Sequence, residues 1–171
     1  MADEKKGKNG GTAAGPAADK QAPAIQAQVV AQYVKDLSFE NPNIERLLSG
    51  PGDDPNLKVE VNVNAKPMAD KLYESQIQFT AKAESKAGVI YEIECLYAGL
   101  FHIENMPPPS LEPFLLINCP TLLFPFLRRL LADITREGGF PPLLLDPIDF
   151  AQLYVQRQQQ MAPGNDNPKI N

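Results

Sequence analysis

This sequence is short of the residues that carry enzyme chemistry. Its 171 residues include one histidine, two cysteines and no tryptophan. It has no GxSxG, no HExxH and no glycine-rich phosphate loop, which are local signatures of hydrolases, metalloproteases and nucleotide-binding proteins. The lone histidine, His102, falls in a strand pattern, and Cys119 has no basic partner that the sequence identifies. A catalytic role is therefore disfavoured, and no cofactor or metal site is expected.

The two cysteines are also unsuited to a disulfide framework. Cys95 and Cys119 both lie in apolar stretches, without CxxC spacing. Because a secretory signal peptide is also missing, we expect a reduced, cytoplasmic location. The apolar runs are short and interrupted, so direct membrane insertion is not expected.

Clustered basic charge is absent as well. The formal net charge is −5, which argues against nucleic acid as the partner because phosphate binding needs grouped lysines and arginines. The acidity is uneven: residues 36–112 hold 13 acidic and 6 basic side chains, whereas residues 113–171 hold five of each. The acidic half predicts a basic partner.

What the sequence does contain is one domain's length of patterned residues. Residues 1–24 are rich in alanine, glycine, proline and lysine without an apolar period, and we expect a disordered leader there. Residues 161–171 are expected to form a flexible tail. The domain itself is assigned to residues 25–160.

Alternation of apolar and polar residues predicts four β-strands, over 25–40, 57–65, 71–83 and 88–103. In the first, one face is expected to hold Ile25, Ala27, Val29, Ala31, Tyr33, Leu37 and Phe39. The second face of 88–103 begins with Glu92 and Glu94 and then becomes apolar at Leu96, Ala98 and Leu100. An apolar second face needs a cover, so these last three residues are predicted to lie at an interface between subunits.

After residue 109 the pattern becomes helical. Ser110 is expected to cap a short helix over 111–117, which Pro120 ends. Pro125 suits the first turn of a longer helix that runs to Glu137, because its missing N–H would be unpaired there. Strands followed by helices predict an α+β domain, a four-stranded antiparallel sheet with helices packed on one face.

Two further signals concern helix ends. Gly138 and Gly139 supply the left-handed position that ends the long helix. A last helix is expected to start with Asp146 as its cap, Pro147 at its first position and Asp149 in its first turn.

The acidic residues of the strands share faces in pairs. Asp36 and Glu40 are four residues apart on one strand, and Glu92 and Glu94 are two apart on another, so each pair projects to one side. Spacing alone leaves two readings open, an ordinary solvated face and a binding surface.

Three stretches resemble the SecB family of bacterial protein-export chaperones. The first is "CPTLLFPFLRRLLADITREGGFPPLLLDPIDFAQLYVQR" at 119–157, with its Cys-Pro, its F-P-F helix segment, its glycine followed by Phe-Pro and its "DPIDF" helix start. The others are "YVKDLSFENPN" at 33–43 and "LYAGLFHI" at 96–103. The resemblance covers about residues 25–160.

This resemblance implies a cytoplasmic homotetramer, a dimer of dimers, without enzymatic activity or cofactor. Such a chaperone holds unfolded secretory precursors without ATP and delivers them to SecA, the motor of the Sec translocon. The basic, zinc-bearing C-terminal segment of SecA would bind an acidic sheet face, here Asp36, Glu40, Glu92 and Glu94. The C-terminal helix around 152–160 would be a second contact.

The resemblance also suggests a client groove, for which the candidates are Tyr73, Tyr91, Phe124, Phe126, Leu48 and Leu57. Three features depart from the family pattern: the leader, Glu92 where the family has an apolar contact two residues before Glu94, and "SGPGDDPNL" where relatives often have a tryptophan. Two alternatives remain, a SecB-like chaperone dedicated to one partner such as an antitoxin, and an oligomeric carrier of apolar ligands. The carrier would need one enclosed pocket.

Overall fold

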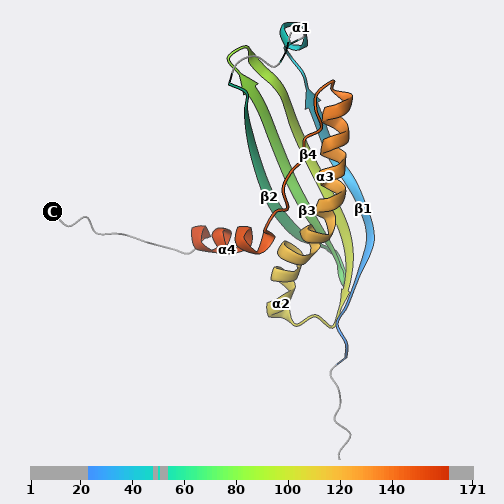
Figure 1. Cartoon of the computed structure of the whole chain (residues 1–171). Coiled ribbons are helices and arrows are strands. Elements are labelled where there is room, and N and C mark those ends of the chain that lie inside the picture. Colours follow the sequence, from blue (N-terminus) through green and yellow to red (C-terminus); the bar gives the residue numbers. More distant parts are fainter. Residues whose placement is uncertain (1–22, 48–49, 51–53, 162–171) are drawn as a thin grey trace, which may run out of the picture.

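An antiparallel sheet forms one layer of the domain, and helices lie against one of its faces (Figure 1). The structure is a computed structural model that describes residues 23–47, 50 and 54–161. Its strands are β1 (Gln26–Glu40), β2 (Asn56–Ala69), β3 (Leu72–Ser85) and β4 (Gly88–Glu104). They lie in the order β1-β4-β3-β2, so β1 and β2 are the edges. The predicted α+β fold is confirmed.

Short connections account for the antiparallel order of the last three strands. β2 returns into β3 through Asp70 and Lys71, and Lys71 adopts a positive φ of 56°. β3 returns into β4 through Lys86 and Ala87, after which Gly88 has a φ of 121°. Returns this short can join only antiparallel neighbours. Most of the predicted leader (1–24) and tail (161–171) lies outside the described residues.

The sheet has a helix-covered face and an open face. Cross-strand partners project to the same side, so the register assigns residues to each. On the helix-covered face lie Ile93, Cys95, Tyr97, Gly99 and Phe101 of β4. The open face holds Asp36, Ser38 and Glu40 of β1, Glu92, Glu94, Leu96, Ala98 and Leu100 of β4, and Glu74, Gln76, Gln78 and Thr80 of β3.

Two bulges in β1 correct the predicted face of that strand. Val29 pairs with Phe101 and Ala31 with Leu100, which leaves Val30 as an extra residue. Val34 pairs with Tyr97 and Asp36 with Leu96, which leaves Lys35 extra. Each extra residue reverses the alternation. The prediction that Ala31 and Tyr33 share a face with Val29 and Leu37 was therefore wrong, because both lie on the open face.

The helical part is more continuous than its prolines suggested. α2 (Pro108–Pro113), the π-helix η1 (Phe114–Asn118) and α3 (Cys119–Glu137) follow one another without a break. Pro120 therefore does not end a helix and Ser110 is not its cap, since Pro108 already lies in its first turn. Pro125 lies inside α3 instead of opening it. Pro125 has no N–H to donate to the carbonyl of Thr121, four residues earlier. Both residues are exposed, so water can bind that carbonyl instead.

The continuity bears on the membrane question. The helix Pro108–Glu137 spans 30 residues and is by length and composition apolar enough to cross a membrane. The prediction that every apolar stretch is too short was therefore wrong. However, 44% of its most apolar window is buried inside the domain. This is the behaviour of a core helix, which passes the same test of length and composition.

α3 packs closely on the sheet at a glycine. Its residues Leu123, Leu127 and Leu131 are fully buried. A Cβ atom on Gly99 of β4 would lie 2.6 Å from Cδ2 of Leu123, so the absence of a side chain sets the helix-to-sheet distance. The helix ends as predicted, with Gly139 at a φ of 86°.

The chain then crosses back to α4 (Phe150–Met161), which projects beyond the β2 edge (Figure 1). Asp149 caps α4, because its Oδ1 accepts a hydrogen bond from the backbone N of Gln152 at 2.9 Å. The predicted cap, Asp146, and the predicted first residue, Pro147, both precede the helix. A short helix, α1 (Ile44–Leu47), follows β1.

Candidate functional site

The structure brings four predicted acidic residues onto one surface. Glu40 pairs directly with Glu92 on the open face. Glu94, opposite Ser38, and Asp36, opposite Leu96, occupy the next two positions on that face. Asp36 and Glu94 both line a shallow hollow of about 250 Å3 together with Gln78. We call Asp36, Glu40, Glu92 and Glu94 the acidic face.

The charges of the acidic face are not neutralised locally. No lysine or arginine among the described residues lies within 4.0 Å of any of the four carboxylates. Lys82, directly opposite Glu92 in the register, lies instead 4.0 Å from Glu84. Four carboxylates grouped on a flat surface produce a negative potential that attracts a basic partner.

Sequence reasoning missed a fifth acid on this face. Glu74 lies on the open face, yet its side chain is only 2% exposed. Tyr33 donates a hydrogen bond to its Oε1 at 2.5 Å, and Lys35 Nζ lies 3.1 Å from both carboxylate oxygens. Gln76 donates to Oε2 and Lys66 lies 3.4 Å from it. A charged residue within the interior strand β3 was the signal that could have revealed this network.

The network determines the ionisation of its members. Burial alone would raise the pKa of Glu74, but hydrogen bonds from Tyr33, Gln76 and Lys35, with the charge of Lys35, lower the pKa to about 2. The hydrogen bond to Glu74 raises the pKa of Tyr33 to about 12. Glu74 is therefore a carboxylate, and Tyr33 a neutral donor, throughout the physiological range.

The predicted subunit interface, Leu96, Ala98 and Leu100, lies beside this network on the open face. Ala98, which pairs with Tyr33 and Gln76, has no exposed surface in the single chain. The argument that a second subunit must cover it therefore fails for Ala98. Leu96 and Leu100 are half-buried on the same face.

Three hollows follow one another along the edge strand β2, on the helix-covered side and, at the second hollow, around the edge to Asn62, Asn64 and Gln78 of the open face. The first, about 330 Å3, includes Asn56 and Leu57, the second, about 370 Å3, includes Val61 to Asn64, and the third, about 430 Å3, includes Asn64 to Pro67. We call this row the β2 groove. Its other wall is formed in turn by the loop residues Phe140 to Leu144, by Leu116 with Leu153, Tyr154, Gln156, Arg157 and Gln160, and by Pro108, Leu111, Glu112, Leu115, Leu116 and Arg157.

Three of the predicted client residues line the β2 groove. Leu57, 42% exposed, and Tyr91 lie in the first hollow, and Tyr73 lies in the third. Tyr91 is packed between Phe39 and Phe140, with ring centroids 5.9 and 5.3 Å away. Along β4, the partner of Tyr73 is ten residues from Tyr91, about 33 Å at the rise of a strand.

The other three candidates lie elsewhere. Phe124 is buried and packs edge-on against Phe150, with centroids 5.9 Å apart. Phe126 is 51% exposed on α3, outside the β2 groove. Leu48 lies outside the described residues. Sequence reasoning missed the wall of loop residues from Phe140 to Leu144, because their position depends on where the chain crosses after α3.

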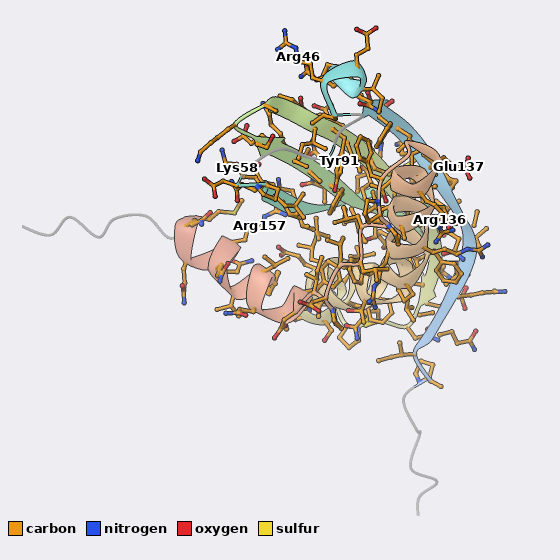
Figure 2. The ribbon with its side chains drawn as sticks, turned by 45° about the horizontal axis from the view of Figure 1, so that its top comes forward. Arg46, Lys58, Tyr91, Arg136, Glu137 and Arg157 are labelled. Carbon is orange, nitrogen blue, oxygen red and sulfur yellow. The ribbon has the colours of Figure 1, made fainter. Side chains whose placement is uncertain are left out.

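A hydrogen bond joins α4 to β2 in the middle of the groove. Arg157 of α4 donates from Nη1 to the backbone oxygen of Val63 at 2.7 Å (Figure 2). Figure 2 shows Arg157 between α4 and the sheet. The backbone oxygen of Val63 on the edge strand therefore points towards the groove, and in this structure Arg157 binds it.

A family model identifies the family of this chain. The model described as "Preprotein translocase subunit SecB" matches residues 19–161, which is most of the chain. This chain belongs to the SecB family. The family's general role, a chaperone for preprotein export, therefore applies to it.

Relatives and a solved structure agree with the SecB assignment. A "Protein-export protein SecB" of Methylocella silvestris is 48% identical over 149 residues, covering 87% of this chain and 91% of the relative. One of a Bradyrhizobium species is 47% identical, covering 82% and 87%. A Mycobacterium tuberculosis SecB-like chaperone, solved in complex with a peptide from an antitoxin, has a TM-score of 0.57 at 14% identity, covering 71% of this chain and 90% of the other. That likeness supports the fold.

The residues that might have suggested an enzyme have ordinary environments in this SecB fold. Cys119 has no exposed surface, and burial raises its pKa to about 12. Burial and the charge of Asp36 raise the pKa of Cys95 to about 11. Both are protonated thiols at neutral pH and poor nucleophiles. His102 lies 3.8 Å from Glu104 on the partly exposed end of β4.

Proposed function

We propose that this chain is an ATP-independent holdase that binds unfolded secretory precursors and delivers them to SecA in the cytoplasm. It acts by binding alone, without catalysis. The observation that carries the proposal is the separation of two surfaces. An uncompensated acidic face lies on β1 and β4 on the open side of the sheet, and the β2 groove, which is largely apolar at its two ends, runs along the opposite edge. A client and a basic partner could therefore be bound at the same time.

The acidic face is the proposed SecA site. Asp36, Glu40, Glu92 and Glu94 offer four carboxylates on a flat, exposed surface, which suits a basic segment rather than an apolar one. Screening by salt should weaken the interaction because the surface is open to solvent. The C-terminal helix, around 152–160, is proposed as a second SecA contact.

The β2 groove is the proposed client site. β2 is an edge strand, so its outer backbone groups, apart from the Val63 oxygen that Arg157 occupies, can pair with an extended chain. Leu57, Tyr91, Leu144 and Tyr73 supply apolar surface at intervals along it. Binding through backbone and general apolar burial does not read sequence, as a chaperone for many precursors requires.

A homotetramer, a dimer of dimers, is proposed for the assembled protein. Besides the predicted interface residues Leu96, Ala98 and Leu100, other apolar side chains are exposed on the single chain. Leu122 and Phe126 are 53% and 51% exposed on α3, and Val30 and Val34 are 54% and 42% exposed on the edge strand β1. Sedimentation at micromolar concentration tests this, and a stable monomer would overturn it.

The SecA proposal is tested by charge removal. Asp36→Ala with Glu94→Ala should weaken binding of the zinc-bearing C-terminal SecA segment in a low-salt titration, while binding of an unfolded precursor stays unchanged. The matched control is Glu137→Ala with Asp146→Ala, which removes two exposed carboxylates from the helix-covered side. Unchanged SecA affinity in the first variant, or an equal loss in the control, would contradict the assignment.

The client proposal needs a different variant. Leu144 is 69% exposed in the first hollow, whereas Val155 is 51% exposed on α4 and lines none of the three. Without ATP, the wild-type protein should slow refolding of a precursor; Leu144→Asp should reduce this activity and Val155→Asp should not. If both variants or neither lose it, the groove assignment is wrong. A chaperone dedicated to an antitoxin would hold its one partner and fail with unrelated precursors.

A further inference from the structure

The position of the acidic face depends on the two bulges of β1: the Val30 bulge reverses the alternation, and the Lys35 bulge reverses it again before Asp36. Tyr33 and Asp36 both lie on the open face although they are three positions apart. In an unbroken strand, residues three apart project to opposite sides. Because Lys35 is an extra residue between them, Tyr33 and Asp36 project to the same side. Without this bulge, Asp36 and Glu40 would face the helices, and Leu37 and Phe39 would face solvent.

The bulge is tied to a strand that is not its neighbour. Lys35 Nζ reaches both carboxylate oxygens of Glu74 at 3.1 Å, and Glu74 belongs to β3, with β4 in between. Tyr33, two residues before Lys35, donates to the same carboxylate at 2.5 Å. The small side chain of Ala98 lies on β4 opposite Tyr33 and is completely covered. The bulged segment is therefore anchored across β4.

Glu74 also has partners on β3 and on β2. Gln76 donates to its Oε2 and Lys66 of β2 lies 3.4 Å away. A carboxylate fixed by partners on three strands is a rigid anchor, because moving it would leave a buried charge without its hydrogen bonds. Lys35 is the partly exposed member, with 29% of its side chain accessible.

We propose that Glu74 and Lys35 are positioning residues for the SecA site, because their ion pair fixes the β1 bulge that places Asp36 and Glu40 beside Glu92 and Glu94. This rests on the proposed function. Neither residue needs to touch the partner. They set the geometry in which the four carboxylates converge.

Simple electrostatics makes the opposite prediction for Lys35, which allows a sharp test. Removing a positive charge next to an acidic surface should strengthen binding of a basic segment. If Lys35 instead holds the bulge, Lys35→Met should weaken binding of the zinc-bearing SecA segment by about tenfold, comparable to the loss of one well-placed charge contact. Glu74→Gln is less informative, since both explanations predict weaker binding.

Matched variants complete the experiment. Lys82→Met removes an equal charge from the same face, opposite Glu92 but away from the bulge, and should bind equally well or more tightly. Lys35→Arg keeps the ion pair and should restore affinity close to that of the wild type. If Lys35→Met binds as tightly as Lys82→Met, the positioning role is wrong.

Folding is checked separately with full-length protein. Lys35→Met should still slow precursor refolding, since Lys35 lies on β1, at the opposite edge of the sheet from the β2 groove. If that variant does not fold, Tyr33→Phe removes one hydrogen bond without a change of charge and should bind the segment about threefold more weakly; unchanged binding would refute the proposal. Failure of the wild-type protein to bind the segment would instead refute the SecA assignment itself.

Discussion

Thr135 offers a direct test of how the wall of the β2 groove is held. This residue of α3 has no exposed surface. Its Oγ1 donates to the carbonyl of Leu131 at 2.9 Å and accepts from the backbone N of Leu143 at 2.8 Å. Leu143 is itself buried in the segment that forms the wall. One hydroxyl therefore joins the groove wall to the helix.

Thr135→Val keeps the shape of the side chain and removes the acceptor. The N–H of Leu143 is then buried without a partner, which costs about 1–3 kcal/mol of the free energy of unfolding. Denaturant unfolding at one fixed protein concentration measures this loss, since the stability of an oligomer depends on concentration. Hydrogen exchange at the Leu143 amide should accelerate, and precursor binding should weaken as the wall loosens.

Thr121→Val is the matched control. Thr121 makes the same kind of bond, from Oγ1 to the carbonyl of Ile117 at 2.6 Å, but it is exposed on the helix surface. Its replacement should change stability by less than about 0.5 kcal/mol. Equal stabilities of the two variants, or unchanged exchange at Leu143 in Thr135→Val, would refute the reasoning.

Three further outcomes are expected. Gly99→Ala should destabilise the protein by about 1–3 kcal/mol in denaturant unfolding, because the new methyl group overlaps Leu123; a neutral result would mean that α3 can shift freely. Cys119 should resist iodoacetamide at pH 8 until the protein unfolds, which mass spectrometry can follow, and rapid labelling of the native protein would contradict its burial. The pKa of Glu74 falls from 4.5 to about 2 on folding, so its contribution of about 3 kcal/mol is present above pH 4.5 and disappears as the pH falls towards 2. The stability difference between wild type and Glu74→Gln should shrink over that range, and a constant difference would contradict the assignment.

Local pattern was sufficient for the strands and for part of the site. Alternation identified all four strands, because a sheet with one buried face imposes a two-residue period on the sequence. The same period placed Glu92 with Glu94 and Asp36 with Glu40. The two glycines marked the helix end, since Gly139 takes a backbone conformation that other residues avoid. These features depend on neighbours within a few residues.

Tertiary structure decided what depends on distant strands. The bulges at Val30 and Lys35 are set by pairing with β4, and they moved Tyr33 to the face where it meets Glu74. Proline, which usually ends helices, stays inside α3 at position 125 because packing of that helix on the sheet outweighs one lost hydrogen bond. The sequence alone determined that this is a SecB-type sheet with acidic residues on its strands. The register between strands, a non-local property, determined which of those residues share a surface.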